Sequence, residues 1–223
     1  DAIALVVRHR PYLMARTDFR RLEHWVSLFP PATVQTSPEL LLAGAWLRQF
    51  QCDVRATRML SRNAEEVMAG VDADPVLLRS WAGEAQSLLS FSELLEGNYA
   101  EAVAASMRSL DLLAPDRLYL RSFAAYMASV CLHVAGRQTE AEAVLLAFRN
   151  EPGSAHDFRQ MRYLQTRSQI MVLTGDADAL RVGAIELAGL GHTLDMGASE
   201  GWGHYYGGIA FYLQNDLRSA YEQ

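Results

Sequence analysis

The pattern of apolar and polar positions along this chain favours helices throughout. No segment alternates apolar and polar residues long enough to predict a β-strand. Helical segments instead fall into pairs, bounded by start signals such as Ser37-Pro38 and Asp74-Pro75 and by the helix-ending Pro30-Pro31. The first helices of the pairs are expected near 2–15, 38–49, 75–95, 118–134, 157–173 and 199–213. The second helices are expected near 18–29, 53–69, 99–113, 138–149 and 177–190.

A short turn motif recurs between the two helices of each pair. Its clearest copies are Gly97-Asn98-Tyr99-Ala100-Glu101-Ala102 and Gly136-Arg137-Gln138-Thr139-Glu140-Ala141. The expected turns start near residues 17, 51, 97, 136, 175 and 215, with spacings of 34, 46, 39, 39 and 40 residues. Such a period predicts an α-solenoid of antiparallel helical hairpins over 1–223 as a single repeat domain. The pattern stops inside the sixth hairpin, so we expect a fragment of a larger chain.

Small residues mark a second register of the same repeat. They stand seven positions before the last five expected turns, at Gly44, Ser90, Ser129, Ser168 and Gly208. A large side chain at such a position would hold two antiparallel helices apart. We therefore expect all five residues to be buried where the two helices of a hairpin cross.

Composition and charge narrow the class of protein. The chain has 32 Ala and 31 Leu, and its 20 basic residues are all Arg, which suggests a bacterial source. The net charge of −6 argues against a nucleic-acid-binding surface on this fragment. Cys52 and Cys131 form neither a disulfide framework nor a metal spacing, and the longest nearly uncharged run, 123–136, is too short to span a bilayer. No signal-peptide pattern opens the chain, so we expect a cytoplasmic location without membrane contact.

Catalytic and cofactor patterns are present only in incomplete form. Gly197-Ala198-Ser199-Glu200-Gly201 matches the Gly-x-Ser-x-Gly elbow, but a helix and a glycine-rich loop are expected before it instead of a strand. The run 201–207 misses the dinucleotide fingerprint by one position, and the six histidines lack a metal spacing. We therefore expect no enzyme, no catalytic residue, no metal and no cofactor here, with Ser199 capping the next helix.

The turn and the N-terminal stretch resemble known repeat proteins. The helical hairpin with Gly-(Asn/Asp)-Tyr-x-x-Ala at its turn is similar to a tetratricopeptide repeat. Leu22-Glu23-His24-Trp25-Val26-Ser27-Leu28-Phe29-Pro30, followed by Pro38-Glu39-Leu40 and Ala45-Trp46, resembles the opening of the MalT-like repeat domain of large LuxR-type transcriptional regulators. The likeness covers nearly the whole chain.

That resemblance implies a function for the segment. Family members carry an ATP-binding STAND module before the repeats and a helix-turn-helix DNA-binding domain after them. Neither is expected within these residues. A chain without Lys cannot hold the Walker-type loop of the first, and no basic recognition helix is present for the second. The resemblance leaves sensing to the repeats, through a small-molecule inducer or a regulatory protein, with self-association possible. The alternative is a stand-alone tetratricopeptide scaffold for protein–protein interaction.

In such solenoids the first helix of each hairpin lines the concave surface, which is the usual binding surface. Counting back from the turns places Glu84, Phe123, Arg162 and Trp202 thirteen positions before a turn and Ser87, Tyr126, Gln165 and Tyr205 ten positions before. Aromatic faces beside hydrogen-bonding groups suit a small polar ligand or a peptide. The alternative for any one aromatic is ordinary packing between repeats. The candidate binding residues are Phe123, Tyr126, Arg162, Gln165, Trp202 and Tyr205, with the glycine-flanked run 201–208 letting the backbone approach the ligand.

Overall fold

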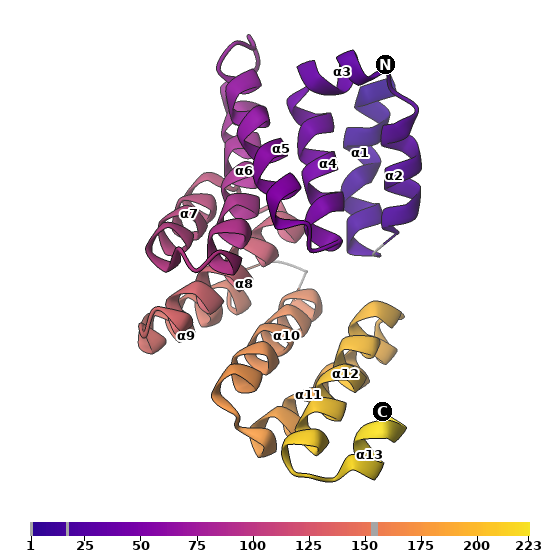
Figure 1. Ribbon diagram of the computed structural model, residues 1–223, viewed down its shortest axis with the longest axis vertical. Helices are drawn as coiled ribbons and strands as arrows, with labels where there is room; N and C mark the ends of the chain where they lie inside the picture. The colour runs from indigo at the N-terminus through magenta and orange to yellow at the C-terminus, as the bar shows by residue number, and fades with distance from the viewer. Residues whose placement is uncertain (1, 17, 153–155) are drawn as a thin grey trace. The chain divides into compact units, whose positions relative to one another are not determined.

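The computed structural model describes residues 2–16, 18–152 and 156–223, and these residues form helices without a strand (Figure 1). Helix accounts for 82% of the chain. The chain folds into two compact units, Asp1–Cys131 and Leu132–Gln223, which we describe separately. The helices are α1 (Ala2–Ala15), α2 (Phe19–Ser27), α3 (Pro31–Thr36), α4 (Pro38–Phe50), α5 (Val54–Met68), α6 (Pro75–Leu95), α7 (Tyr99–Leu112), α8 (Leu118–Val134), α9 (Gln138–Arg149), α10 (His156–Thr174), α11 (Ala177–Thr193), α12 (Gly197–Leu213) and α13 (Leu217–Glu222).

Side-chain caps start many of these helices. The Ser37 hydroxyl accepts a hydrogen bond from the Leu40 backbone N–H at 3.3 Å, and the Asp74 carboxylate accepts one from Val76 at 2.7 Å. Each cap satisfies a backbone donor that the first helical turn leaves free. The second helices of four hairpins start in the same way, with caps at Asp18, Asp53, Asp176 and Asp216.

The turns between paired helices share one backbone conformation. Gly97, Gly136 and Gly175 have φ of +82°, +78° and +72°, the left-handed region that glycine adopts without strain. Cys52 and Asn215 take that conformation in the second and sixth turns, with φ of +57° and +61°. Between the two helices of each pair, the described helix breaks lie within two residues of the expected turns, and Thr17, in the first, lies outside the described residues.

The second turn and the region after it differ from expectation. Helix α4 continues through Phe50, so the left-handed residue is Cys52, one position later than the turn expected at Gln51. The pair Pro30-Pro31 ends α2 but also starts the unexpected short helix α3, because a proline at the first helical position needs no N–H donor. Helix α11 runs to Thr193, so the expected glycine-rich loop is largely helical.

Three of the five small residues that stand seven positions before the expected turns are buried, and two are only partly buried. Ser90, Ser129 and Ser168 are at most 2% exposed, as expected. Gly44 and Gly208 are only partly buried, so the expectation of full burial is wrong for these two. In the second hairpin the fully buried Ala45 takes the position seven before Cys52, which follows from the one-residue shift of that turn.

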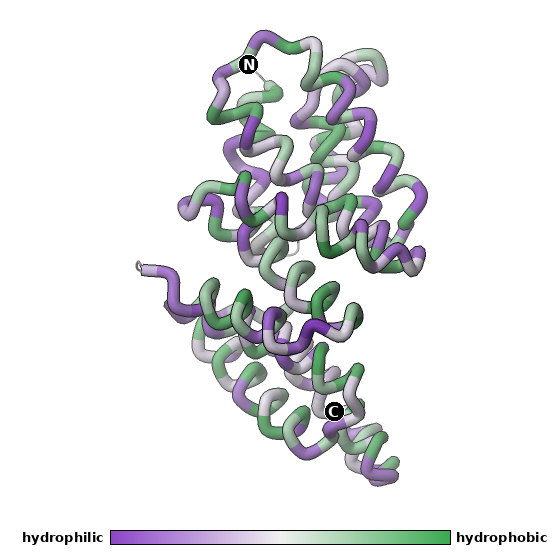
Figure 2. Tube along the Cα trace, turned by 90° about the vertical axis from the view of Figure 1, so that its left-hand side faces the viewer, coloured by the Kyte–Doolittle hydropathy of each residue, from purple (hydrophilic) through white to green (hydrophobic). Residues whose placement is uncertain are grey.

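The N-terminal unit packs helices that are neighbours in the chain and also first helices of successive hairpins. Helix α4 contacts α1, α2, α3, α5 and α6, and Figure 1 shows α1, α2 and α4 side by side. Hydrophobic and hydrophilic residues alternate along the helices in Figure 2, as amphipathic packing requires. The core of this unit surrounds Trp46, which is fully buried.

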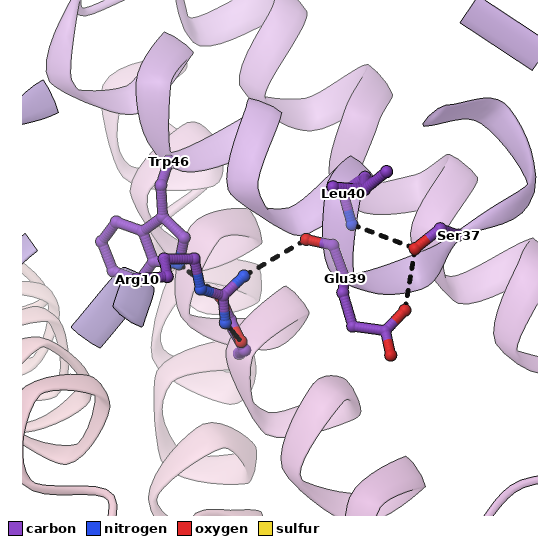
Figure 3. Close-up of polar contacts among 6 residues, drawn as sticks. Arg10, Ser37, Glu39, Leu40 and Trp46 are labelled. Carbon is purple, nitrogen blue, oxygen red and sulfur yellow. Dashed lines mark hydrogen bonds and ion pairs between the residues drawn. The ribbon is translucent and has the colours of Figure 1, made fainter. Parts of the chain in front are cut away.

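A buried ion pair crosses this core. The Arg10 Nη2 atom donates to the Glu84 carboxylate at 2.7 Å, and the Trp46 indole Nε1–H donates to its other oxygen at 2.6 Å. Arg10 also donates to the Glu39 backbone carbonyl at 3.3 Å, beside the Ser37 cap (Figure 3). Arg10 is 7% exposed and Glu84 is 1% exposed. The pair therefore joins α1, α4 and α6 across 74 residues of sequence.

The C-terminal unit contains the tightest helix crossing that the structure describes. A Cβ atom added at Gly203 in α12 would lie 2.5 Å from the Ala188 backbone nitrogen in α11. A Cβ atom at Gly191 in α11 would lie 2.5 Å from the Glu200 backbone nitrogen in α12. These distances are below any van der Waals contact, so only glycine lets α11 and α12 approach so closely.

Replacing Gly203 with Ala should destabilise the C-terminal unit, because the added methyl group meets backbone that cannot move without opening the α11–α12 crossing. We expect a loss of about 1–3 kcal/mol or more in the free energy of unfolding. The matched control is Gly201→Ala, two positions away in α12, where a Cβ meets nothing within 4 Å. The control should stabilise by about 0.5–1 kcal/mol through helix propensity. Urea unfolding of both variants measures the difference, and equal midpoints would contradict the close approach.

Replacing Glu84 with Ala should strongly destabilise the N-terminal unit, because Arg10 would stay buried without its counter-ion. Breaking such a pair costs about 3–5 kcal/mol. The double variant Arg10→Met/Glu84→Leu, which removes both charges, should recover most of that loss. As a control, Glu222→Ala breaks the exposed pair with Arg218 and should leave the denaturation midpoint unchanged. A Glu84→Ala variant as stable as the unchanged protein would show that Arg10 does not need this partner.

Candidate functional site

The six candidate binding residues are divided between the two units. Phe123 and Tyr126 lie in α8, in the part that belongs to the N-terminal unit. Arg162 and Gln165 lie in α10, and Trp202 and Tyr205 lie in α12, all in the C-terminal unit. That these six residues form one continuous patch stays a prediction. The two residues of the N-terminal unit and the four of the C-terminal unit are described separately.

The Phe123 ring packs mostly against the core of the N-terminal unit. Its ring meets the buried Trp46 ring edge-on, with centroids 4.7 Å apart and planes at 72°. It is one of the partly buried residues packed against the N-terminal core. Glu84, thirteen positions before its turn like Phe123, is buried in the ion pair with Arg10. In this unit that position therefore faces neighbouring first helices, which is the inter-repeat packing weighed as the alternative.

Tyr126 is partly buried beside Phe123, with ring centroids 6.0 Å apart. Burial raises the pKa of its phenol to about 12, and the nearby Cys131 adds a smaller effect in the same direction. Burial also raises the pKa of the Cys131 thiol to about 12, partly opposed by a hydrogen bond with Ser106 in α7. The Tyr126 phenol is therefore neutral at physiological pH and can serve a ligand only as a hydrogen-bonding group.

On α10, Arg162 and Gln165 form one polar group. The Arg162 Nη1 atom donates to the Gln165 side-chain oxygen at 2.8 Å, and its guanidinium lies 5.3 Å from the centroid of the Phe158 ring. Both polar residues are partly buried. Phe158 and Gln165 together restrict the Arg162 side chain, so its planar donors are held in a defined orientation.

On α12, two exposed aromatic rings form a right-angled pair. Trp202 is 42% exposed and Tyr205 is 56% exposed, and their centroids are 5.3 Å apart with planes at 86°. Trp202 also lies nearly parallel to Tyr206, at 5.7 Å and 30°. Tyr206 is 2% exposed and belongs to the core of the unit. The exposed indole is thus supported from beneath by a buried ring.

A hydrogen bond links the two helices of this candidate site. The Tyr206 hydroxyl donates to the Gln169 side-chain oxygen at 3.2 Å, from α12 to α10. Gln169 stands one helical turn after Gln165. The structure therefore places Arg162–Gln165 and Trp202–Tyr205 on two helices that contact each other and that the Tyr206–Gln169 bond joins. Tyr206 was not among the residues expected from sequence, although it follows Tyr205 by about 100° around the helix, on the side that faces the core.

The glycine run on α12 serves packing within the protein. Gly203 faces α11, and Cβ atoms at Gly207 and Gly208 would lie 3.3–3.4 Å from Gln223 and Ala220. The run 201–208 was expected to let the backbone approach a ligand, whereas Gly203, Gly207 and Gly208 face other parts of the protein. Ser199 lies inside the first turn of α12, after the N-cap Met196, so its expected capping role is wrong. The Gly-x-Ser-x-Gly pattern is helical and follows helix α11.

The described residues offer neither a metal site nor a membrane-spanning helix. Among them no group of three or more His, Cys, Asp or Glu side chains could hold a metal ion. None of their helices combines the length and apolar character that crossing a membrane requires.

No family model, curated protein or solved structure matches this chain.

The two cysteines should differ sharply in reactivity, because only the thiolate attacks alkylating reagents. Cys52 is exposed, whereas Cys131 is buried with its pKa raised to about 12. At pH 8, iodoacetamide should modify one thiol of the native protein and both thiols in denaturant, as mass spectrometry would count. A Cys52→Ser variant should lose the native reaction and Cys131→Ser should keep it. Rapid native labelling of Cys131 would show that α8 does not pack as described.

Proposed function

We propose that this chain is a solenoid of tetratricopeptide-like hairpins that senses an inducer or a regulatory protein for a MalT-like, LuxR-type transcriptional regulator. Paired antiparallel helices support the solenoid, as do contacts between first helices of successive hairpins, α4 with α6 and α10 with α12. ATP binding and DNA binding would belong to other domains of such a regulator, which would act in the cytoplasm. In this proposal the fragment has no catalytic role.

The observation that carries the proposal is the exposed pair of Trp202 and Tyr205 on a first helix. Large aromatic rings left in water offer contact area at little cost in conformational entropy, because each side chain has only two rotatable bonds. The stack of Trp202 on buried Tyr206 restricts it further. A surface prepared in this way suits binding better than it suits solvation.

The neighbouring polar groups suggest the chemistry of the ligand. Arg162 supplies planar donors that suit a carboxylate, a phosphate or paired hydroxyl groups. The Trp202 and Tyr205 rings suit a flat apolar face on the same ligand. The proposed ligand is accordingly a small polar molecule with one flat face, or a peptide that presents such a group.

A thermal-shift screen of sugars, aromatic metabolites and amino acids tests the proposal. A ligand present at a hundredfold excess over its Kd stabilises the native state by about 2.7 kcal/mol. With a ligand in hand, Trp202→Ala and Arg162→Ala should each weaken binding by about tenfold or more, or about 1.4 kcal/mol. Without ligand, each variant should melt at the same temperature as the unchanged protein, because neither side chain is fully buried in the core.

Matched controls separate the site from general surface effects. Tyr221→Ala removes another exposed aromatic, on α13, and Arg181→Ala removes an exposed arginine on α11. Both controls should bind the ligand normally. If the two site variants bind normally while a change on α9 abolishes binding, the sensing surface lies elsewhere and the proposal is wrong.

A further inference from the structure

A small pocket lies between α10 and α11, the two helices of the fifth hairpin, and the proposed function does not use it. Its volume is about 190 Å³. A water molecule takes up about 30 Å³ in the liquid, so the pocket has room for more than a single water. It is smaller than the roughly 300–1,000 Å³ of pockets for drug-sized ligands, so it fits a molecule of few atoms.

A buried hydroxyl group without a hydrogen-bond partner lines this pocket. Ser168 is 2% exposed, and its Oγ atom has no partner among the described residues. Ser90, at the equivalent position of the third hairpin, donates to the Ser87 backbone carbonyl at 2.6 Å. Buried polar atoms nearly always have a partner, because an unpaired one has lost its hydration without a replacement. The Ser168 hydroxyl is therefore a group that a bound molecule can satisfy.

The space beside this hydroxyl exists because Gly183 of α11 stands opposite it. A Cβ atom added at Gly183 would lie 3.2 Å from the Ser168 Oγ atom. Glycine and serine are too small to fill the space between the two helices at this point. Larger apolar side chains form the wall around it, namely those of Leu164, Met171 and Val182.

Two opposite charges line the same pocket and are not paired with each other. Arg167 of α10 and Glu186 of α11 are both exposed, so they lie where the pocket meets solvent. Within the described part of the chain neither side chain forms an ion pair or a hydrogen bond. A guanidinium and a carboxylate at one small pocket can receive an anionic and a cationic group of the same molecule.

We propose that the α10–α11 pocket binds a small aliphatic α-amino acid. The ligand carboxylate accepts hydrogen bonds from Arg167 and from the Ser168 hydroxyl, and the ligand ammonium group donates to Glu186. The aliphatic side chain of the ligand lies against the apolar wall. A mostly apolar lining with a few polar groups that fix the orientation of the ligand is the usual composition of small-molecule sites.

Four probes that differ by one group each test the proposal on the full chain. Valine carries all three groups, isobutylamine lacks the carboxylate, isovalerate lacks the amino group, and glycine lacks the aliphatic side chain. Each would be titrated at neutral pH and followed by NMR of the backbone amides. Valine should bind and shift the amide signals of Ser168 and Gly183, and each of the other three should bind at least about tenfold more weakly.

Substitutions of the two charged residues show which end of the ligand each one holds. Arg167→Gln should weaken valine binding by about tenfold and should not weaken isobutylamine, which has no carboxylate. Glu186→Gln should weaken valine to a similar extent and should not weaken isovalerate, which has no ammonium group. A general loss of structure would not produce this crossed pattern. The matched controls, Arg181→Gln on α11 and Glu142→Gln on α9, replace exposed charges and should bind valine normally.

Substitutions beside the buried hydroxyl test the inner end of the pocket. Ser168→Ala should weaken valine binding by about tenfold without loss of stability, because the hydroxyl has no partner to lose among the described residues. Gly183→Ala places a methyl group beside the Oγ atom and should weaken binding at least as much.

Two matched controls accompany these variants. Ser129→Ala removes another buried serine hydroxyl that lacks a partner among the described residues. Gly189→Ala adds a methyl group on α11 where a Cβ meets nothing within 4 Å. Both controls should bind valine normally, and helix propensity favours alanine at both glycine positions, so the fold is retained.

The assignment fails if no probe shifts Ser168 or Gly183, since the pocket would then hold water only. It also fails if isobutylamine or isovalerate binds as tightly as valine, because the pocket would not recognise both charges. Shifts confined to Trp202 and Tyr205 would place valine on the aromatic surface and would contradict this site alone. Neither Trp202 nor Arg162 lines the pocket, so the sensing proposal is tested independently by its own variants.

Discussion

The architecture of each unit depends on how closely neighbouring helices can approach. The crossing of α11 and α12 is set by Gly191 and Gly203, each facing backbone of the opposite helix. In the N-terminal unit, Gly83 of α6 faces Leu113 just beyond α7, where an added Cβ would lie 2.8 Å from the leucine side chain. Larger residues at these points would separate the helices and open voids along their length. These glycines therefore set the separation of the helices that they join, and with it the space left for the larger side chains nearby.

The buried pair of Arg10 and Glu84 contributes in a different way, because it specifies which helices pack together and in which register. Removing two charges from water costs about as much as their attraction returns, so such a pair adds little net stability. Its geometry is nevertheless demanding, since the Glu84 carboxylate accepts from Arg10 and from the Trp46 indole at once. Any other register of α1 or α4 against α6 would leave a buried charge unpaired. We regard this triad as the feature that specifies how the first three hairpins pack, a role that apolar contacts alone fill poorly.

Local features of the fold were predictable from sequence, and long-range ones were not. Caps at Ser37 and Asp74, and glycines at the turns, act within a few residues, so their sequence pattern determines the outcome. The shift of the second turn to Cys52 was missed because a non-glycine residue adopts the left-handed conformation there. Glu84 was expected on a binding surface, since its partner Arg10 lies 74 residues away and no local pattern announces the pair. At the candidate site the aromatic positions were predictable, whereas the supporting Tyr206–Gln169 bond depends on packing between helices.

Two tryptophans show why exposure at the candidate site carries meaning. Trp46 is fully buried and its indole N–H has a charged acceptor, so its role is complete within the core. Trp202 has a buried aromatic neighbour on one side and solvent on another, at 42% exposure. Gly203, the next residue in the chain, faces α11, where a Cβ atom would lie 2.5 Å from the Ala188 backbone nitrogen. The side of α12 that faces α11 at this point therefore has no room for a side chain, and Trp202 lies on another side of the helix, against Tyr206. A restrained, exposed aromatic ring on α12, with a guanidinium held by Phe158 and Gln165 on the contacting helix α10, is the arrangement on which the sensing proposal rests.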